Sequence, residues 1–395
     1  MKICIWSSGS FEEWYSSYHL MLKIILEMLS AGHEVWLIQE QRNDGRMPDE
    51  LQNQEKLHVI NIKKAAVKKQ NFVRRYLGSI QYYISSFKAF KTIERIDAVF
   101  LQSNNTAIIP IRYIRKLKIP VLYNVQDIFP LDALFVGKIS SWNPLFWIVR
   151  ALQAQAYKKA TRVVTISEDL AKTIRAEGRR DVDVIYNWSY QNEPYRIPDE
   201  SNHFLLSNKI RREDCFRVIY AGNVGQMIDG EMIVGAAKAL SDKKDIVFFI
   251  IGEGSGLKRL KNRVSEEGLN NVLFFPRQPM EYAQDNYCAA DININPMPKG
   301  IIYTCMPSKT ATCLLSEKPT VVSMDSDSDM AARLKTVDQW TVVAPGDAQG
   351  MADAIRKVYE NGAGKSENAA SFLKEMGPIE NARKYVEILE EIALH

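Results

Sequence analysis

Short apolar runs alternate with longer amphipathic stretches along most of this 395-residue chain. The first apolar run covers residues 3–7. Residues 18–30 follow with apolar positions at helical spacing, and a second run covers residues 33–39. The same pattern predicts further strands at 57–62, 98–102, 121–125, 163–166 and 182–186. Strands separated by amphipathic helices are typical of parallel βαβ units, so the pattern predicts an α/β fold.

The alternation stops at residues 187–202, NWSYQNEPYRIPDESN, which are rich in Pro, Asn and Glu and have no apolar period. It then resumes, with predicted strands at 216–221, 247–251, 272–275, 292–295, 320–323 and 341–343. We therefore predict two doubly wound, Rossmann-like domains, at residues 1–190 and 203–378, joined by a linker at about 187–202. The chain length fits two domains of roughly 150–200 residues each. Sheets of this kind bind ligands beyond the carboxyl ends of their strands.

Composition narrows the class of protein. A hydrophobic content of 46% and a charged content of 25% are typical of a globular protein. The five cysteines include no C-x-x-C pair, which indicates reduced thiols in the cytosol rather than a disulfide framework or zinc site. The five histidines show no metal-ligand spacing. The start, MKICIWSS, is too short an apolar run for a signal peptide, and no apolar run reaches 18 residues, so we expect no membrane-spanning helix.

Eight segments carry a resemblance to a known family. Four in the second half are VIYAGNVGQMIDGEMIVGAAKAL (218–240), FFIIGEGSGLKRLK (248–261), NNVLFFPRQPMEYAQDNYCAADININPMP (270–298) and MPSKTATCLLSEKPTVVS (306–323). Their order resembles the donor-sugar domain of the GT-B glycosyltransferases of family 4. Upstream, AGHEVWLI (31–38), YNVQDIFP (123–130), VVTISEDLAKTIRAEG (163–178) and VIYNW (184–188) resemble the acceptor domain of that family. The nearest likeness is to bacterial members that build surface polysaccharides, such as capsule and O-antigen, on lipid carriers.

The resemblance implies a donor that is a nucleotide-diphosphate sugar, bound without a metal or other cofactor. The protein must then neutralise the diphosphate itself. Ser308 and Lys309 stand at the predicted start of a helix, after Gly300, and a helix start with small residues and a lysine suits a phosphate. The alternative is that Ser308 is an ordinary N-cap and Lys309 is solvated.

The resemblance assigns further donor contacts to a turn formed by Gly222, Asn223 and Gly225, and to Arg277 in a loop that resembles the base-binding loop. Glycines allow the backbone to approach a ligand closely. The alternatives are that the turn merely allows tight strand–helix packing and that Arg277 is a solvated surface residue.

The sequence departs from the family pattern in each of its two halves. Thr304 and Thr312 stand where family members commonly carry two glutamates, near the transferred sugar and on the nucleotide ribose. Threonine can donate a hydrogen bond but cannot act as a charged acceptor, so another residue substitutes, the donor differs, or the protein is impaired. In the acceptor half, Gln126 and Asp127 replace a common His-Asp pair. Asp127 could orient the acceptor hydroxyl or take its proton, or it could be an N-cap or turn residue.

Residues 63–91 contain eight basic residues and no acidic one, interleaved with aromatic and aliphatic residues. This pattern fits an interfacial helix on anionic lipid that includes Lys68, Lys69, Arg74 and Arg75; the alternative is a solvated face over a core stripe. Basic pairs of this kind can also bind nucleic acid, which we do not expect here. Trp142 begins WNPLFWIVRAL (142–152), which could dock a lipid tail or be buried.

Two further motifs were given no role. MDSDSDM (324–330) resembles the metal motif of the other main glycosyltransferase fold but follows a strand, where an N-cap loop is expected. GEGSG (252–256) lacks the third spaced glycine of a dinucleotide fingerprint.

The expected protein is thus a GT-B glycosyltransferase at the cytoplasmic face of the membrane. It would move a sugar from a nucleotide-diphosphate sugar to a lipid-linked saccharide, and the resemblance implies retention of anomeric configuration. As in the family, the last helix, at about 379–395, would complete the first domain. The alternatives are a GT-B-fold sugar-nucleotide epimerase and a catalytically silent partner subunit.

Overall fold

The chain folds into two α/β units. The computed structural model describes residues 1–7, 9–11, 18–41, 47–63, 72–103, 106–189, 193–362 and 369–394, and gives only the backbone of 72–80, 370 and 371. One compact unit comprises residues 1–134, 139–190 and 377–395, and the other comprises 135–138 and 191–376. Apart from residues 135–138, the chain therefore stays in the first unit until after its seventh strand and returns to it with its last helix.

The first unit is built on a seven-stranded parallel sheet with the order β3-β2-β1-β4-β5-β6-β7. Its strands are β1 (Lys2–Trp6), β2 (Glu34–Gln41), β3 (Leu57–Lys63), β4 (Ala98–Gln102), β5 (Val121–Val125), β6 (Arg162–Thr165) and β7 (Asp183–Val184). Every strand predicted for this half is present. Its helices are α1 (Tyr18–Ser30), α2 (Phe72–Phe90), α3 (Ile108–Lys116), α4 (Leu131–Phe135), α5 (Pro144–Lys159), α6 (Glu168–Ala176) and α15 (Pro378–Ala393).

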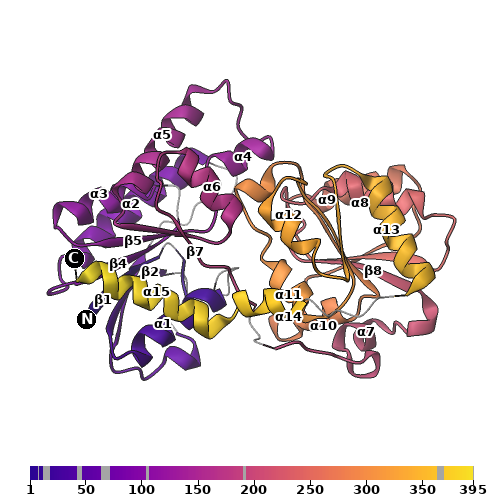
Figure 1. Cartoon of the computed structure of the whole chain (residues 1–395), viewed down its shortest axis with the longest axis horizontal. Helices are drawn as coiled ribbons and strands as arrows, with labels where there is room; N and C mark the ends of the chain where they lie inside the picture. The colour runs from indigo at the N-terminus through magenta and orange to yellow at the C-terminus, as the bar shows by residue number, and fades with distance from the viewer. Residues whose placement is uncertain are drawn as a thin grey trace. The chain divides into compact units, whose positions relative to one another are not determined.

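Helices cover both faces of this sheet (Figure 1), and alternate residues of β1 contact the two helical layers. Ile3 and Ile5 are fully buried against a core formed with α1 and α15. Trp6 points the other way and stacks on Phe90 of α2, with ring centroids 5.4 Å apart. The period of two in the strand thus gives the sheet two apolar faces, as parallel sheets require.

The second unit contains a six-stranded parallel sheet with the order β10-β9-β8-β11-β12-β13. Its strands are β8 (Phe216–Ala221), β9 (Ile246–Ile251), β10 (Val272–Phe275), β11 (Ile292–Pro296), β12 (Thr320–Ser323) and β13 (Trp340–Val343). Its helices are α7 (His203–Asn208), α8 (Gly230–Ala239), α9 (Leu257–Glu266), α10 (Ala283–Cys288), α11 (Lys309–Leu315), α12 (Asp329–Leu334), α13 (Ala348–Asn361) and α14 (Ala369–Glu375). The strand order reverses at β8 and β11, which is where doubly wound sheets bind ligands.

The segment predicted as a linker is partly built into the second unit. Tyr195 donates its backbone N–H to the carbonyl of Leu315 (3.0 Å). Asp199 accepts a bond from the buried guanidinium of Arg217 (2.8 Å), at the start of β8. The missing apolar period thus reflects irregular backbone rather than a free tether, because polar side chains fix this segment.

Candidate functional site

Lys309 lies beside the glycine-rich turn that follows β8. Its Nζ is 3.9 Å from the centroid of the Tyr220 ring. A Cβ placed on Gly222 would lie 2.9 Å from that Nζ, and Gly222 has a φ of +138°, which L side chains rarely adopt. The backbone conformation therefore requires glycine at this position, and the short distance shows how close the lysine lies to the turn. Two features that the sequence singled out separately, the turn and the lysine, meet at the carboxyl end of β8.

A second glycine-rich segment supports this turn from behind. A Cβ on Gly252 would lie 1.9 Å from the carbonyl oxygen of Gly222, and Val224 donates its N–H to the carbonyl of Glu253 (2.8 Å). Residues 252–256, set aside in the sequence because they lack a dinucleotide fingerprint, are thus packed against residues 222–225. Their glycines permit the close approach of two backbones. The sequence signal for this pairing is that both turns follow neighbouring predicted strands.

Tyr220 joins the lysine to the turn, a role that the sequence did not reveal. It is fully buried in β8, and its hydroxyl donates to the carbonyl of Asn223 (2.7 Å). The face of the same ring lies beneath the ammonium group of Lys309. One side chain therefore contacts both parts of the candidate site.

The three other candidate residues around α11 differ in their environments. Ser308 is exposed and occupies the N-cap position of α11, but it already has helical backbone angles and its side chain makes no capping bond. Thr312 is half-buried, and its carbonyl accepts from the Tyr195 hydroxyl (3.1 Å). Thr304 is fully buried and donates its hydroxyl to the carbonyl of Ile301 (3.0 Å). This burial argues against the predicted contact between Thr304 and a donor.

The loop before α11 is fixed by the acidic segment that follows β12. Gly300 is buried at a φ of +80°, and its N–H donates to Oδ2 of Asp325 (2.7 Å). The Tyr303 hydroxyl donates to Oδ1 of Asp327 (2.6 Å), and Ser328 caps α12. The segment 324–330 is therefore the N-cap loop expected from the sequence. Among the described residues, no group of three or more His, Cys, Asp or Glu side chains is arranged to hold a metal ion.

Arg277 lies in the loop after β10 and is exposed. Its guanidinium contacts the sulfur of Met280 (3.6 Å). β10 and β8 are parallel strands with β9 between them, so the loops that follow them lie at the same edge of the sheet. Two strand spacings separate them, which is roughly 10 Å. A nucleotide can span such a distance from phosphate to base.

The acceptor-side candidates follow β5 in the first unit. Gln126 belongs to a chain of side-chain amides: it donates to Asn124 (3.3 Å) and accepts from Asn187 (2.7 Å). Asn124 in turn donates to Gln102 (2.9 Å). Asp127 is exposed at the carboxyl end of β5. The network orients Gln126, while Asp127 is accessible to solvent.

The basic candidates are only partly covered by the structure. Lys68 and Lys69 lie outside the described residues, and Arg74 and Arg75 belong to α2 at positions where only the backbone is described. Trp142 is 93% exposed, so it is not buried in its unit.

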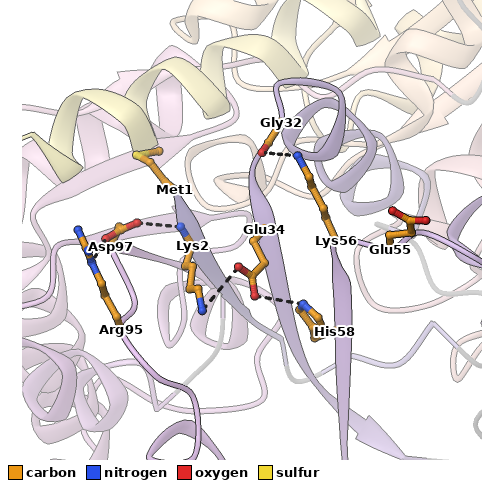
Figure 2. A pocket seen from close by; sticks show the side chains of 9 residues that line it. All are labelled: Met1, Lys2, Gly32, Glu34, Glu55, Lys56, His58, Arg95 and Asp97. Carbon is orange, nitrogen blue, oxygen red and sulfur yellow. Dashed lines mark hydrogen bonds and ion pairs between the residues drawn. The ribbon is translucent and has the colours of Figure 1, made fainter.

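A hollow of about 520 Å³ lies in the first unit, at the amino ends of β1, β2, β3 and β4; Figure 2 shows the side chains that line it. Several of its charged side chains lie against one another: Glu34 accepts from His58 (3.1 Å) and lies 3.6 Å from Lys2, and Arg95 lies 3.5 Å from Asp97. This hollow is at the edge of the sheet opposite to the one that binds ligands in such folds, so we assign it no role.

Comparison with known proteins yields matches to both halves of the chain. A profile of Glycosyltransferase Family 4 matches residues 20–188, and one of Glycosyl transferases group 1 matches residues 215–361. Probable glycosyltransferase WbjE of Pseudomonas aeruginosa is 23% identical over 299 residues, 74% of each chain. The putative colanic acid biosynthesis glycosyl transferase WcaI of Escherichia coli is 24% identical over 242 residues, 59% of this chain and 58% of that protein.

Solved structures match over nearly the whole chain. Anabaena HepE in complex with UDP and glucose superposes with a TM-score of 0.71 at 13% identity, covering 99% of this chain and 100% of that one. WaaG, a glycosyltransferase involved in lipopolysaccharide biosynthesis, superposes with a TM-score of 0.65 at 15% identity, covering 99% and 98%. At such identities the likeness is one of fold.

Proposed function

The chain belongs to the family 4 glycosyltransferases of the GT-B fold, and we propose that it transfers a sugar from a nucleotide-diphosphate sugar to a lipid-linked saccharide with retention of anomeric configuration. The product would be part of a bacterial surface polysaccharide. The names of WcaI and WaaG, which refer to colanic acid and lipopolysaccharide biosynthesis, support this assignment, and we place the reaction at the cytoplasmic face of the membrane.

The observation that supports the proposal most is the position of Lys309 beside Gly222. A diphosphate needs positive charge and close backbone approach, and these two residues offer both at the strand end where such sheets bind ligands. HepE structures contain UDP or UDP-glucose, which makes uridine nucleotides the first donors to test. Lys309 offers the charge that a metal would otherwise supply, so metal-independent binding remains part of the proposal.

In the proposed reaction the bond between the anomeric carbon and the donor phosphate breaks, and a bond from that carbon to the acceptor oxygen forms. Negative charge grows on the departing diphosphate, where an ammonium group lowers the energy of the transition state. The acceptor hydroxyl loses its proton to the departing phosphate. Asp127 would orient that hydroxyl by accepting its hydrogen bond, which sharpens its nucleophilicity.

Turnover of nucleotide sugars, measured with and without a lipid-linked saccharide, tests this function against its alternatives. A transferase releases nucleoside diphosphate only when the acceptor is present and labels that acceptor. An epimerase changes the sugar without any acceptor. The silent-partner alternative is favoured by the buried Thr304, which cannot replace a glutamate; it predicts no turnover of any nucleotide sugar, and that result would overturn the proposal.

A further inference from the structure

Three neighbouring helices of the first unit have an unusual charge. α2, α3 and α5 together contain nine lysines and arginines and no aspartate or glutamate. The whole chain has 51 basic and 47 acidic residues, so this bias does not follow from its composition. Two of the nine, Arg74 and Arg75, lie where only the backbone of α2 is described.

The three helices pack side by side over the same face of the sheet (Figure 1). Phe87 of α2 lies against Tyr113 of α3, with ring centroids 4.3 Å apart. Arg112 of α3 donates a hydrogen bond to Gln155 of α5. The charges of the three helices therefore belong to one surface.

The outward side of this layer carries exposed cations that carboxylates do not neutralise. Arg150 pairs with Glu177 (2.6 Å). Six other basic residues are exposed and form no ion pair within the described part of the chain; we call them the basic face, and they are Lys88, Arg112, Arg115, Lys116, Lys158 and Lys159.

Large apolar side chains are exposed where α5 begins. Trp142 is 93% exposed, Leu145 45%, Trp147 53% and Ile148 57%; we call these four residues the α5 tip. The local backbone is well defined, because Asn143 caps the helix through Leu145 N–H (2.9 Å) and the Trp147 indole donates to the carbonyl of Ser141 (2.9 Å). The exposure of the tip is thus a fixed feature of the fold, and apolar side chains gathered in one place favour a partner that accepts apolar surface.

We propose that the basic face and the α5 tip dock the protein on the surface of an anionic phospholipid bilayer, with the tip inserted at the depth of the headgroups. Tryptophans favour that depth, and lysines and arginines favour anionic lipid. The same charges suit nucleic acid phosphates, but the α5 tip adds leucine and isoleucine, which favour the acyl boundary of a bilayer. This inference extends the proposed function, because a lipid-linked saccharide is presented at such a surface.

Sedimentation of the full-length protein with phosphatidylcholine vesicles, with and without phosphatidylglycerol, tests the proposal. We expect binding to the anionic vesicles that weakens as salt is raised. The triple variant Lys88→Glu, Lys116→Glu, Lys159→Glu should bind at least about a hundredfold more weakly, since each basic residue contributes about fivefold. Its matched control is Lys244→Glu, Lys258→Glu, Lys335→Glu in the second unit, which changes the net charge equally and should bind normally.

The contribution of the apolar α5 tip to vesicle binding is tested with a second variant and its own control. Ile148→Ser should weaken vesicle binding several-fold, whereas Leu206→Ser, at a position that is 59% exposed in the second unit, should not. Brominated lipids should quench tryptophan fluorescence in the wild type and less in Trp142→Ser.

The proposal is overturned if the wild type ignores anionic vesicles at low salt, or if the triple variant binds them as well as its control does. Binding to random-sequence RNA but not to vesicles would overturn it as well and assign the face to nucleic acid. The thermal shift caused by UDP should persist in every variant. A loss of that shift would mark a failure of the donor site or of folding. The vesicle test would then be repeated with the neutral variant Lys88→Gln, Lys116→Gln, Lys159→Gln.

Discussion

At the scale of single residues, Tyr220 and Lys309 define the candidate donor site. The ammonium group sits over an aromatic face, 3.9 Å from its centroid, where the ring quadrupole stabilises a cation. The tyrosine hydroxyl is meanwhile bonded to the turn that begins at Gly222. The lysine is therefore held in place before any ligand binds, which reduces the entropy that binding costs.

Replacing Lys309 with alanine removes that charge. We expect nucleotide-sugar affinity, measured by titration calorimetry, to fall by about 1.5–3 kcal/mol, the usual contribution of a hydrogen bond to a charged group. Lys335→Ala, at an exposed position of the same unit, is the control and should bind normally. Equal affinity of Lys309→Ala and the wild type would leave Lys309 without a phosphate role.

Tyr220 allows the two contacts to be separated. Tyr220→Phe keeps the ring under Lys309 and loses the bond to Asn223, so we expect a few-fold loss of donor affinity; Tyr220→Leu loses both contacts and should cost at least about tenfold. Tyr287→Phe is the matched control, since its hydroxyl also donates to a backbone carbonyl, that of Ala221 (3.2 Å). If Tyr220→Leu lowers only the melting temperature and leaves affinity unchanged, the tyrosine is purely structural.

Asp127 is the residue to change on the acceptor side. Asp127→Asn keeps the shape and removes the charge, so transfer should fall by at least roughly a hundredfold while UDP still raises the melting temperature. A variant that folds and transfers sugar at the wild-type rate would reassign Asp127 to the turn after β5.

At the scale of elements, β8 connects the donor site to the chain that enters its unit. Its carboxyl end carries Tyr220 and the glycine-rich turn, and its amino end carries Arg217, which is fully buried. Burial lowers the pKa of Arg217, but its bonds to Asp291 and Asp199 outweigh this and raise the pKa above its ordinary value. The charged guanidinium therefore fastens the segment around Asp199 to the sheet.

Removing that guanidinium leaves two carboxylates without their partner in a poorly solvated place. We expect Arg217→Met to lower the free energy of unfolding by about 3 kcal/mol, as when a buried ion pair is broken. Arg212→Met, whose side chain is 71% exposed, should change it by less than about 0.5 kcal/mol. Chemical denaturation followed by circular dichroism checks both, and similar values for the two variants would contradict the structural role of Arg217.

At the scale of the whole molecule, the first unit is completed by the end of the chain. α15 buries Tyr385, Val386 and Leu389 in the core shared with α1, and the Tyr385 hydroxyl donates to Asn124 (3.1 Å). Near the carboxyl end of α15, His33 and Glu390 form a further hydrogen bond of 2.9 Å. The first unit therefore cannot form its full core until the second unit has been synthesised.

This arrangement predicts that two leucines of the last segment contribute very differently to the stability of the protein. Leu389 is fully buried, so Leu389→Ala should cost about 2–5 kcal/mol of stability. Leu394 is 84% exposed, so Leu394→Ala should be nearly neutral. Thermal unfolding checks this, and UDP should still raise the melting temperature of both variants; equal melting temperatures would show that α15 is not essential to the core.

The sequence by itself determined the strands and their class. β4 and β5 begin and end where predicted, because parallel strands buried on both faces are short continuous apolar runs between polar segments. It also singled out Lys309, since a lysine at a predicted helix start is a local signal, whereas Gly222 became a donor-site candidate through the resemblance to the family. The segment 187–202 was harder to predict, because irregular backbone fixed by polar side chains has no apolar period.

Only the tertiary structure decided which of these signals meet. Lys309 reaches Gly222 because β11, which precedes α11, pairs with β8, and strand order is not written in local periodicity. Thr304 is buried and bonded to the carbonyl of Ile301, whereas Trp142 is exposed just before α5. Burial depends on what the rest of the chain packs against a residue. The sequence of an aromatic-rich segment therefore does not show whether the segment fills a core or faces solvent.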